Sequence, residues 1–209
     1  HYGPRGLALA IVGAVDPEQA VEKTARALGD WQNPLPPLPA ELPALTRLEQ
    51  RTTRQVSIPG KSQADLLIGA AGPARASMDF MPAMVGNNIL GQFGMMGRIG
   101  EAVRERAGLA YYAASHLSGG TGPGPWSMSA GVDPENISKV IDLVIEEIQR
   151  FTSEPVSADE LADSKSDFIG HLPLSLESNA GVASALIHLA RHQLGLDYYY
   201  RYAGLINAV

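Results

Sequence analysis

The sequence predicts an α+β domain, a two-layer sandwich in which helices pack on one face of a mostly antiparallel sheet. Short apolar or alternating segments between residues 55 and 132 suit strands joined in hairpins. Amphipathic stretches from residue 137 onward suit helices that bury one side against that sheet. The composition, 45% hydrophobic and 18% charged over 209 residues, is typical of a folded globular chain.

The N-terminal region predicts a strand followed by a helix. Residues 7–13 form a short apolar run that ends at a glycine, which suits a buried strand. Asp16-Pro17-Glu18 then supplies an N-cap, a first-turn proline and a first-turn acid, so we expect a helix over residues 17–28.

A proline-rich stretch separates this region from the rest. Residues 33–45 hold five prolines in thirteen positions, which excludes a helix or a central strand. We expect residues 33–51 to be a linker, either free or lying on the surface as an ordered loop. It divides a strand–helix segment at 1–32, the remnant of a preceding domain, from a domain at 52–209. The first residues lack an initiator Met, and we expect an excised fragment.

The central segments combine strand and helix patterns, and Pro59-Gly60 between the first two strands suggests a hairpin. Gly108 suits the end of the second helix. The expected strands are 55–58, 63–70, 109–115 and 126–132, and the expected helices are 77–90 and 94–106.

The C-terminal part predicts helices only. Asp133-Pro134-Glu135 repeats the earlier corner and precedes a helix whose apolar residues from 137 to 151 share one face. Ser157 and Glu160 form a capping box for a helix to about Leu172. Further helices are expected over 179–194 and 197–205.

Charge and cysteine content exclude several functions. A net charge of −6 argues against binding nucleic acid, which needs a cationic surface. No apolar run is long enough for a membrane helix. The absence of cysteine excludes disulfides, thiolate metal sites and cysteine nucleophiles. We expect a soluble protein, and the absence of cysteine is compatible with both the cytoplasm and the periplasm.

One histidine pair has metal-ligand spacing. His188 and His192 would share a helix face and could both reach a zinc ion. In the inverted zinc-protease motif, His-x-x-Glu-His, a glutamate precedes the second histidine. Arg191 holds that position here and cannot act as a base. We interpret the pair as surface or packing histidines, with adventitious metal binding as the alternative and a catalytic zinc least favoured.

Other motifs are weak on their own. Glycines recur every third residue from Gly91 to Gly100, but no phosphate-binding motif is present, so close helix packing is the better interpretation. No G-x-S-x-G elbow supports a serine triad. Arg104 and Tyr111 are strong donors that could bind a carbonyl or a developing oxyanion. Taken alone, they read as a charged helix end followed by a strand tyrosine.

Several stretches together resemble a known family. Residues 88–91, 97–106 and 108–111 resemble the "LGG…SRL…VRE…GLAY" signature of the C-terminal, non-catalytic half of the pitrilysin/insulinase/mitochondrial-processing-peptidase family of zinc peptidases. Residues 7–18 resemble the strand–helix corner that closes the preceding catalytic half. Residues 157–195 resemble the helical hairpin that follows the signature. The resemblance covers most of the chain.

The resemblance implies homologous α+β halves that close like a clamshell around an unfolded peptide. One half binds zinc through His-x-x-Glu-His and a distal Glu, and the other contributes an Arg and a Tyr seven positions apart. These correspond to Arg104 and Tyr111. Tyr111 would hydrogen-bond the scissile carbonyl as it becomes tetrahedral, and Arg104 would hold the substrate main chain or the same oxygen. Arg98 corresponds to the signature's "SRL" Arg, read as structural.

The chain departs from the signature where Gly97 and Ile99 replace its Ser and Leu, and no His-x-x-Glu-His is present. We therefore expect no cofactor in this fragment, and zinc in a catalytic half that lies upstream or in a separate subunit. With that half and an unfolded peptide as partners, the chain would be the substrate-binding half of an inverted-zincin metallopeptidase, inactive alone. The alternative is a catalytically inactive scaffold or interaction subunit. The domain at 52–209 is expected to end before its last strand and helix.

Overall fold

The computed structural model describes residues 3–33, 45–46 and 48–209. Most of the predicted linker, and His1, lie outside the described residues. The chain divides into two compact units, and each is described by itself. One comprises residues 169–203 with the described part of 1–44, and the other comprises 204–209 with the described part of 45–168. The second unit contains the sheet, Arg104 and Tyr111.

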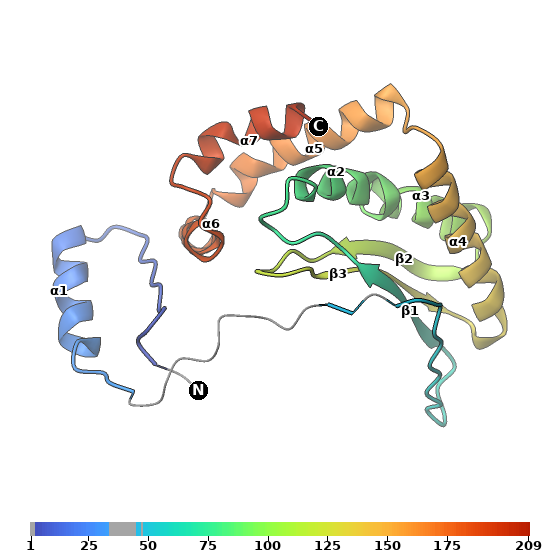
Figure 1. Ribbon diagram of the computed structural model, residues 1–209, viewed down its shortest axis with the longest axis horizontal. Helices are drawn as coiled ribbons and strands as arrows, with labels where there is room; N and C mark the ends of the chain where they lie inside the picture. The colour runs from blue at the N-terminus through green and yellow to red at the C-terminus, as the bar shows by residue number, and fades with distance from the viewer. Residues whose placement is uncertain (1–2, 34–44, 47) are drawn as a thin grey trace. The chain divides into compact units, whose positions relative to one another are not determined.

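Three antiparallel strands form the sheet in the order β1-β3-β2 (Figure 1). They are β1 (Ala64–Ala71), β2 (Ala110–Leu117) and β3 (Pro125–Val132). The central strand β3 pairs with β1 on one side and with β2 on the other. The predicted α+β class is confirmed, and the strands predicted at 63–70, 109–115 and 126–132 form within two residues of their expected bounds.

Two predicted strands do not form. Residues 7–13 and 55–58 carry no strand, and Leu9 and Val56 are exposed. β1 pairs with β3 rather than with residues 55–58, so the predicted hairpin is wrong. A strand needs a neighbour that satisfies its N–H and C=O groups. The alternating pattern shows that a segment suits a pleated surface, but it does not identify the neighbouring segment.

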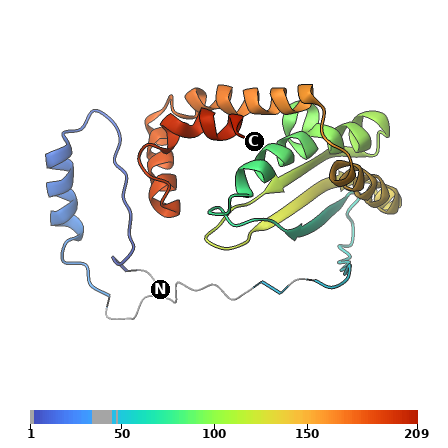
Figure 2. The ribbon, with the colours of Figure 1, turned by 45° about the horizontal axis from the view of Figure 1, so that its top comes forward.

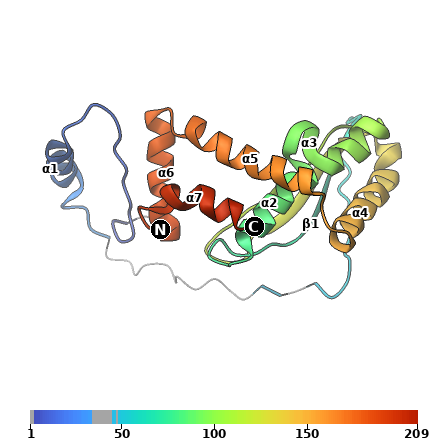
Figure 3. The ribbon, with the colours of Figure 1, turned by 90° about the horizontal axis from the view of Figure 1, so that it is seen from above.

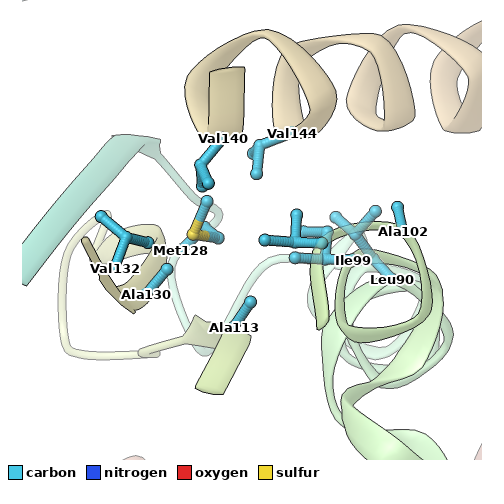
Figure 4. Close-up of a cluster of buried hydrophobic side chains, with 10 residues drawn as sticks. Leu90, Ile99, Ala102, Ala113, Met128, Ala130, Val132, Val140 and Val144 are labelled. Carbon is cyan, nitrogen blue, oxygen red and sulfur yellow. The ribbon is translucent and has the colours of Figure 1, made fainter. Parts of the chain in front are cut away.

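Helices cover one face of the sheet. α2 (Phe80–Gly91), α3 (Phe93–Gly100), the π-helical turn η1 (Glu101–Arg106) and α4 (Ile137–Ser153) lie over the strands (Figures 1 and 3). Within the described residues of this unit, no helix covers the opposite face (Figure 2). The helices and strands share one apolar cluster (Figure 4). Its buried members are Leu90, Ile99, Ala102, Val103, Ala113, Met128, Ala130, Val132, Val140 and Val144.

The helix predicted over 94–106 is interrupted at its start. Residues 94–97 have a non-helical backbone, with φ of 58° at Gly94, 75° at Met96 and 62° at Gly97. A β-carbon at Gly97 would lie 2.5 Å from the Ile89 carbonyl oxygen, and one at Gly91 would collide with Ser115. Gly91 and Gly97 are closely packed, Gly91 against strand β2 rather than a helix, whereas a β-carbon at Gly94 would meet nothing within 4 Å. Gly94 and Gly97 also form a tight turn with left-handed φ values, a feature that was not predicted from the sequence.

Capping residues begin several helices as predicted. The Asp16 and Asp133 carboxylates each accept a backbone N–H of the following turn. Ser157 and Glu160 form the expected capping box, in which the Glu160 N–H donates to Ser157 Oγ at 3.2 Å. Along the part of the chain that is described, no helix is both long and apolar enough to cross a membrane. The remaining helical elements are α1 (Pro17–Leu28), η2 (Pro134–Asn136), α5 (Ala158–Ser175), α6 (Asn179–His192) and α7 (Tyr198–Asn207).

Candidate functional site

Arg104 lies in the last turn of η1, directly before the chain turns into β2. Gly108 ends the helix as predicted, with a left-handed φ of 65°, and its N–H donates to the Arg104 carbonyl at 3.0 Å. The Leu109 N–H donates to the Val103 carbonyl at 3.0 Å. These bonds fix the backbone, while the Arg104 side chain stays 32% exposed and its Nε lies 3.6 Å from Glu105 Oε1. The guanidinium therefore keeps donors for another ligand.

Tyr111 lies in a β-bulge of β2. Ala110 pairs with Val132 and Tyr112 pairs with Gly131, so Tyr111 is one extra residue between consecutive partners on β3. In a regular ladder Tyr111 would stand opposite Val132 and face the core, because the side-chain period of a strand is two. With the bulge, Ala110 takes that place and Tyr111 is 82% exposed. The bulge therefore presents the tyrosine hydroxyl to solvent.

The structure brings the two predicted site residues to the same junction of η1 and β2. Arg104 lies in the last turn of η1, before the turn at Gly108, and Tyr111 is the second residue of β2, after that turn. Arg104 is paired with Glu105 and not with Tyr111. Bulges and π-helical turns are both enriched at functional sites, and this junction has one of each.

Arg98 lies in α3 and is held by an ion network. Its Nε and Nη2 donate to Glu160 Oε1 and Oε2 at 2.6 and 2.7 Å, and its Nη1 lies 4.0 Å from Glu147 Oε1. The bidentate bond to Arg98 lowers the pKa of Glu160 to about 2, aided by the Ser157 N–H and hydroxyl and opposed by partial burial. The network joins α3, α4 and α5, which agrees with a structural role for Arg98.

Asn87 is a buried polar residue that the sequence analysis did not identify. Its Oδ1 accepts from Ser115 Oγ at 2.7 Å and from Trp126 Nε1 at 2.8 Å, so one amide joins α2 to β2 and β3. A buried amide with two good donors anchors one arrangement of helix and strands. The available signal was an asparagine pair, Asn87-Asn88, within an apolar stretch that the helix buries on several sides.

The described residues do not fit a zinc site. His188 and His192 lie one turn apart on α6 with ring centroids 4.7 Å apart. Among the residues that the structure describes, no three His, Cys, Asp or Glu side chains gather where they could hold a metal ion. Structural zinc needs about four protein ligands and catalytic zinc about three, so two histidines are not enough.

These features define an α+β domain that presents an Arg and a Tyr at the junction of a helix and a strand. Residues 1–168 match the family profile described as "Peptidase M16 inactive domain". The match covers most of the chain, which therefore belongs to the peptidase M16 family through its inactive domain.

Individual relatives agree with this assignment. The chain is 29% identical over 191 residues to "Uncharacterized zinc protease SCO5738" of Streptomyces coelicolor, covering 89% of this chain and 41% of the relative. The peptidase M16 inactive domain from Pseudomonas fluorescens has a TM-score of 0.66 and 26% identity, covering 80% of this chain and 41% of that chain. A protease from Helicobacter pylori has a TM-score of 0.78 over 95% of this chain and 48% of that chain. At 18% identity, the latter likeness shows the fold alone.

The chain spans about two fifths of the length of the curated relatives that it matches. Those relatives are named zinc proteases, whereas the matching domain is described as inactive.

Proposed function

We propose that this chain is the substrate-binding, non-zinc half of an inverted-zincin metallopeptidase, which closes over an unfolded peptide and stabilises its scissile carbonyl. The observation that carries this proposal is the bulge in β2, which leaves Tyr111 exposed across the Gly108 turn from Arg104. A tyrosine in a regular strand at this position would be buried against Val132. Bulges are over-represented next to active sites, where they re-aim a side chain, and a role of Tyr111 toward a ligand agrees with this.

Tyr111 would act as a hydrogen-bond donor. When water adds to the scissile carbonyl, its oxygen gains negative charge, and an O–H already in place stabilises that charge more than it stabilises the ground state. Arg104 would donate N–H groups to substrate main-chain carbonyls or to the same oxygen. Neither residue supplies a nucleophile or a base, so both act on a peptide activated elsewhere.

The zinc and its general base would belong to another half. The histidines of this chain do not form a sufficient ligand set in the described residues. The curated relatives are more than twice as long as the part they share with this chain, which leaves room in them for a zinc-binding half. That half, upstream in the same polypeptide or in a separate subunit, and an unfolded peptide are the partners that we propose.

Elemental analysis and a cleavage assay test this function together. The purified chain should contain no stoichiometric zinc and should not cleave an unstructured fluorogenic peptide. Joined to its zinc-binding half, it should support cleavage that a chelator abolishes. About one zinc per isolated chain with chelator-sensitive cleavage would contradict the accessory role. A complete assembly that binds no zinc and cleaves nothing would instead identify a scaffold subunit.

A further inference from the structure

The β2 bulge leaves two neighbouring tyrosines competing for one position on the sheet. On either side of it, Ala110 pairs with Val132 and Ala113 pairs with Ala130. Between these pairs β2 has two residues, Tyr111 and Tyr112, while β3 has only Gly131. One tyrosine must stand opposite Gly131, and the other must be extruded.

The apolar core cannot decide between them. The core-facing pairs are the same whichever tyrosine is extruded, because Ala110 and Ala113 keep their partners in both arrangements. Register is strongly specified only where a buried face distinguishes the alternatives. The choice must therefore depend on contacts made on the face of the sheet that no described helix of this unit covers.

Tyr112 makes those contacts. A β-carbon on Gly131 would lie 2.5 Å from Gln63 Nε2, 2.6 Å from Tyr112 Cε1 and 3.1 Å from Tyr112 Cδ1, so the tyrosine ring lies on the glycine backbone beside the Gln63 amide. The ring reaches toward β1, where Asp65 is the other partner of Gly131. Tyr112 Oη donates to Asp65 Oδ1 at 3.4 Å, and Gln63 Nε2 donates to the same oxygen at 3.2 Å. An aromatic ring covering a strand glycine is a known way to pin register.

Ring packing carries most of this contact. A 3.4 Å O–H···O hydrogen bond is long and weak. Partial burial of the phenol, and then the Asp65 carboxylate, raise the pKa of Tyr112, which agrees with a ring set against the sheet beside a negative charge. We expect the phenyl group to matter more than the hydroxyl.

We propose that Tyr112, by occupying the place on Gly131, keeps Tyr111 extruded and is thus the positioning residue for the Tyr111 hydroxyl. The structural part concerns this chain alone, and the kinetic part rests on the proposed function of Tyr111. Without the Tyr112 ring, the Tyr111 side chain can move onto Gly131. The Tyr111 hydroxyl is then drawn away from the substrate.

Fluorine NMR of the full chain, with 3-fluorotyrosine at position 111, tests the structural part. Tyr112→Ala should shift the fluorine resonance or add a second one, whereas Tyr112→Phe, which keeps the ring, should leave it unchanged. Gly131→Ala should also move it, because the new methyl group would displace the Tyr112 ring as well as the Gln63 amide. Gly69→Ala is the matched control, since a β-carbon there has no neighbour closer than 3.5 Å. An unmoved resonance in both Tyr112→Ala and Gly131→Ala, with thermal unfolding showing folded chains, would overturn the inference.

A double-mutant cycle in the complete peptidase tests the kinetic part. Tyr112→Ala should lower kcat about tenfold with little change in KM, whereas Tyr112→Phe, which keeps the ring, should have the wild-type kcat. In a Tyr111→Phe background, Tyr112→Ala should cost nothing further, because the hydroxyl that it positions is already gone. The same tenfold loss in both backgrounds would contradict a positioning role. If Tyr111→Phe itself turned over normally, the proposed function would fail, while the fluorine result would still decide the bulge.

Discussion

Two arginines of one helical stretch have opposite surroundings. Arg98 is almost buried, makes two short bonds to Glu160 and lies near Glu147. Arg104, six residues later, has one exposed pair at 3.6 Å with its neighbour Glu105. Where the fold satisfies a guanidinium, that residue stabilises the fold. Where the fold leaves guanidinium N–H groups available, as at Arg104, the side chain can bind a ligand.

Replacing Arg98 should give the largest loss of stability. Arg98→Met leaves Glu160 without its bidentate partner and leaves the buried Glu147 with Arg150 alone. Breaking a largely buried ion pair costs about 3 kcal/mol of unfolding free energy. The matched variant Arg104→Met should stay within about 0.5 kcal/mol of wild type. Urea unfolding of both variants makes the comparison, and equal losses would remove the distinction between the two arginines.

The Arg98–Glu160 pair also predicts a pH dependence. The pKa of Glu160 is lowered to about 2 in the folded chain, from 4.5 as the ordinary value. A lowered folded pKa contributes stability above the unfolded pKa, and this is lost as pH falls through the folded value. Wild type should therefore lose about 1–2 kcal/mol more than Glu160→Gln between pH 5 and pH 2, a range reduced because the carboxylate is one-third exposed. Parallel stability curves for the two proteins would show that Glu160 is not the titrating group.

Replacing Arg104 conservatively should affect turnover without affecting stability. Arg104→Lys keeps the charge but loses the planar fork of donors, so we expect kcat/KM of the complete peptidase to fall about fivefold to tenfold. The unfolding midpoint should not move. Steady-state kinetics with an unstructured peptide measures the loss, and unaltered kinetics would leave Arg104 as a surface charge.

The smallest effect is expected at the capping box beside the network. Ser157→Ala removes the oxygen that accepts the Glu160 N–H, which should cost about 0.5–1 kcal/mol. Because the cap belongs to the stabilising region, kcat and KM of the complete peptidase should not change. A kinetic defect in this variant would mean that α5 contributes to the site.

Local signals allowed much of this fold to be predicted from the sequence. The Asp-Pro-Glu corners, the capping box and Gly108 act within one turn of the chain, and each forms as expected. Residues 7–13 and 55–58 fail as predicted strands because a strand also depends on a partner that its own sequence does not specify.

The resemblance to a family identified the site residues, but their geometry could not be predicted from the sequence. Arg104 and Tyr111 are recognisable in the sequence, whereas the bulge follows from pairing two residues of β2 with one of β3. The residue of β3 in that pairing is Gly131, which lies about twenty residues further along the chain, so the sequence around Tyr111 does not reveal the bulge. Asn87 was missed for a related reason, since its two donors come from separate strands.

The most direct test of the central claim is the turnover of Tyr111→Phe in the complete zinc-bound peptidase. This change removes one hydroxyl from an exposed ring, so it should leave the unfolding midpoint unchanged. We predict a fall in kcat of roughly 10²–10³-fold, the scale for losing one oxyanion donor. Turnover at the wild-type rate would remove Tyr111 from the mechanism and contradict the role of this chain in stabilising the scissile carbonyl.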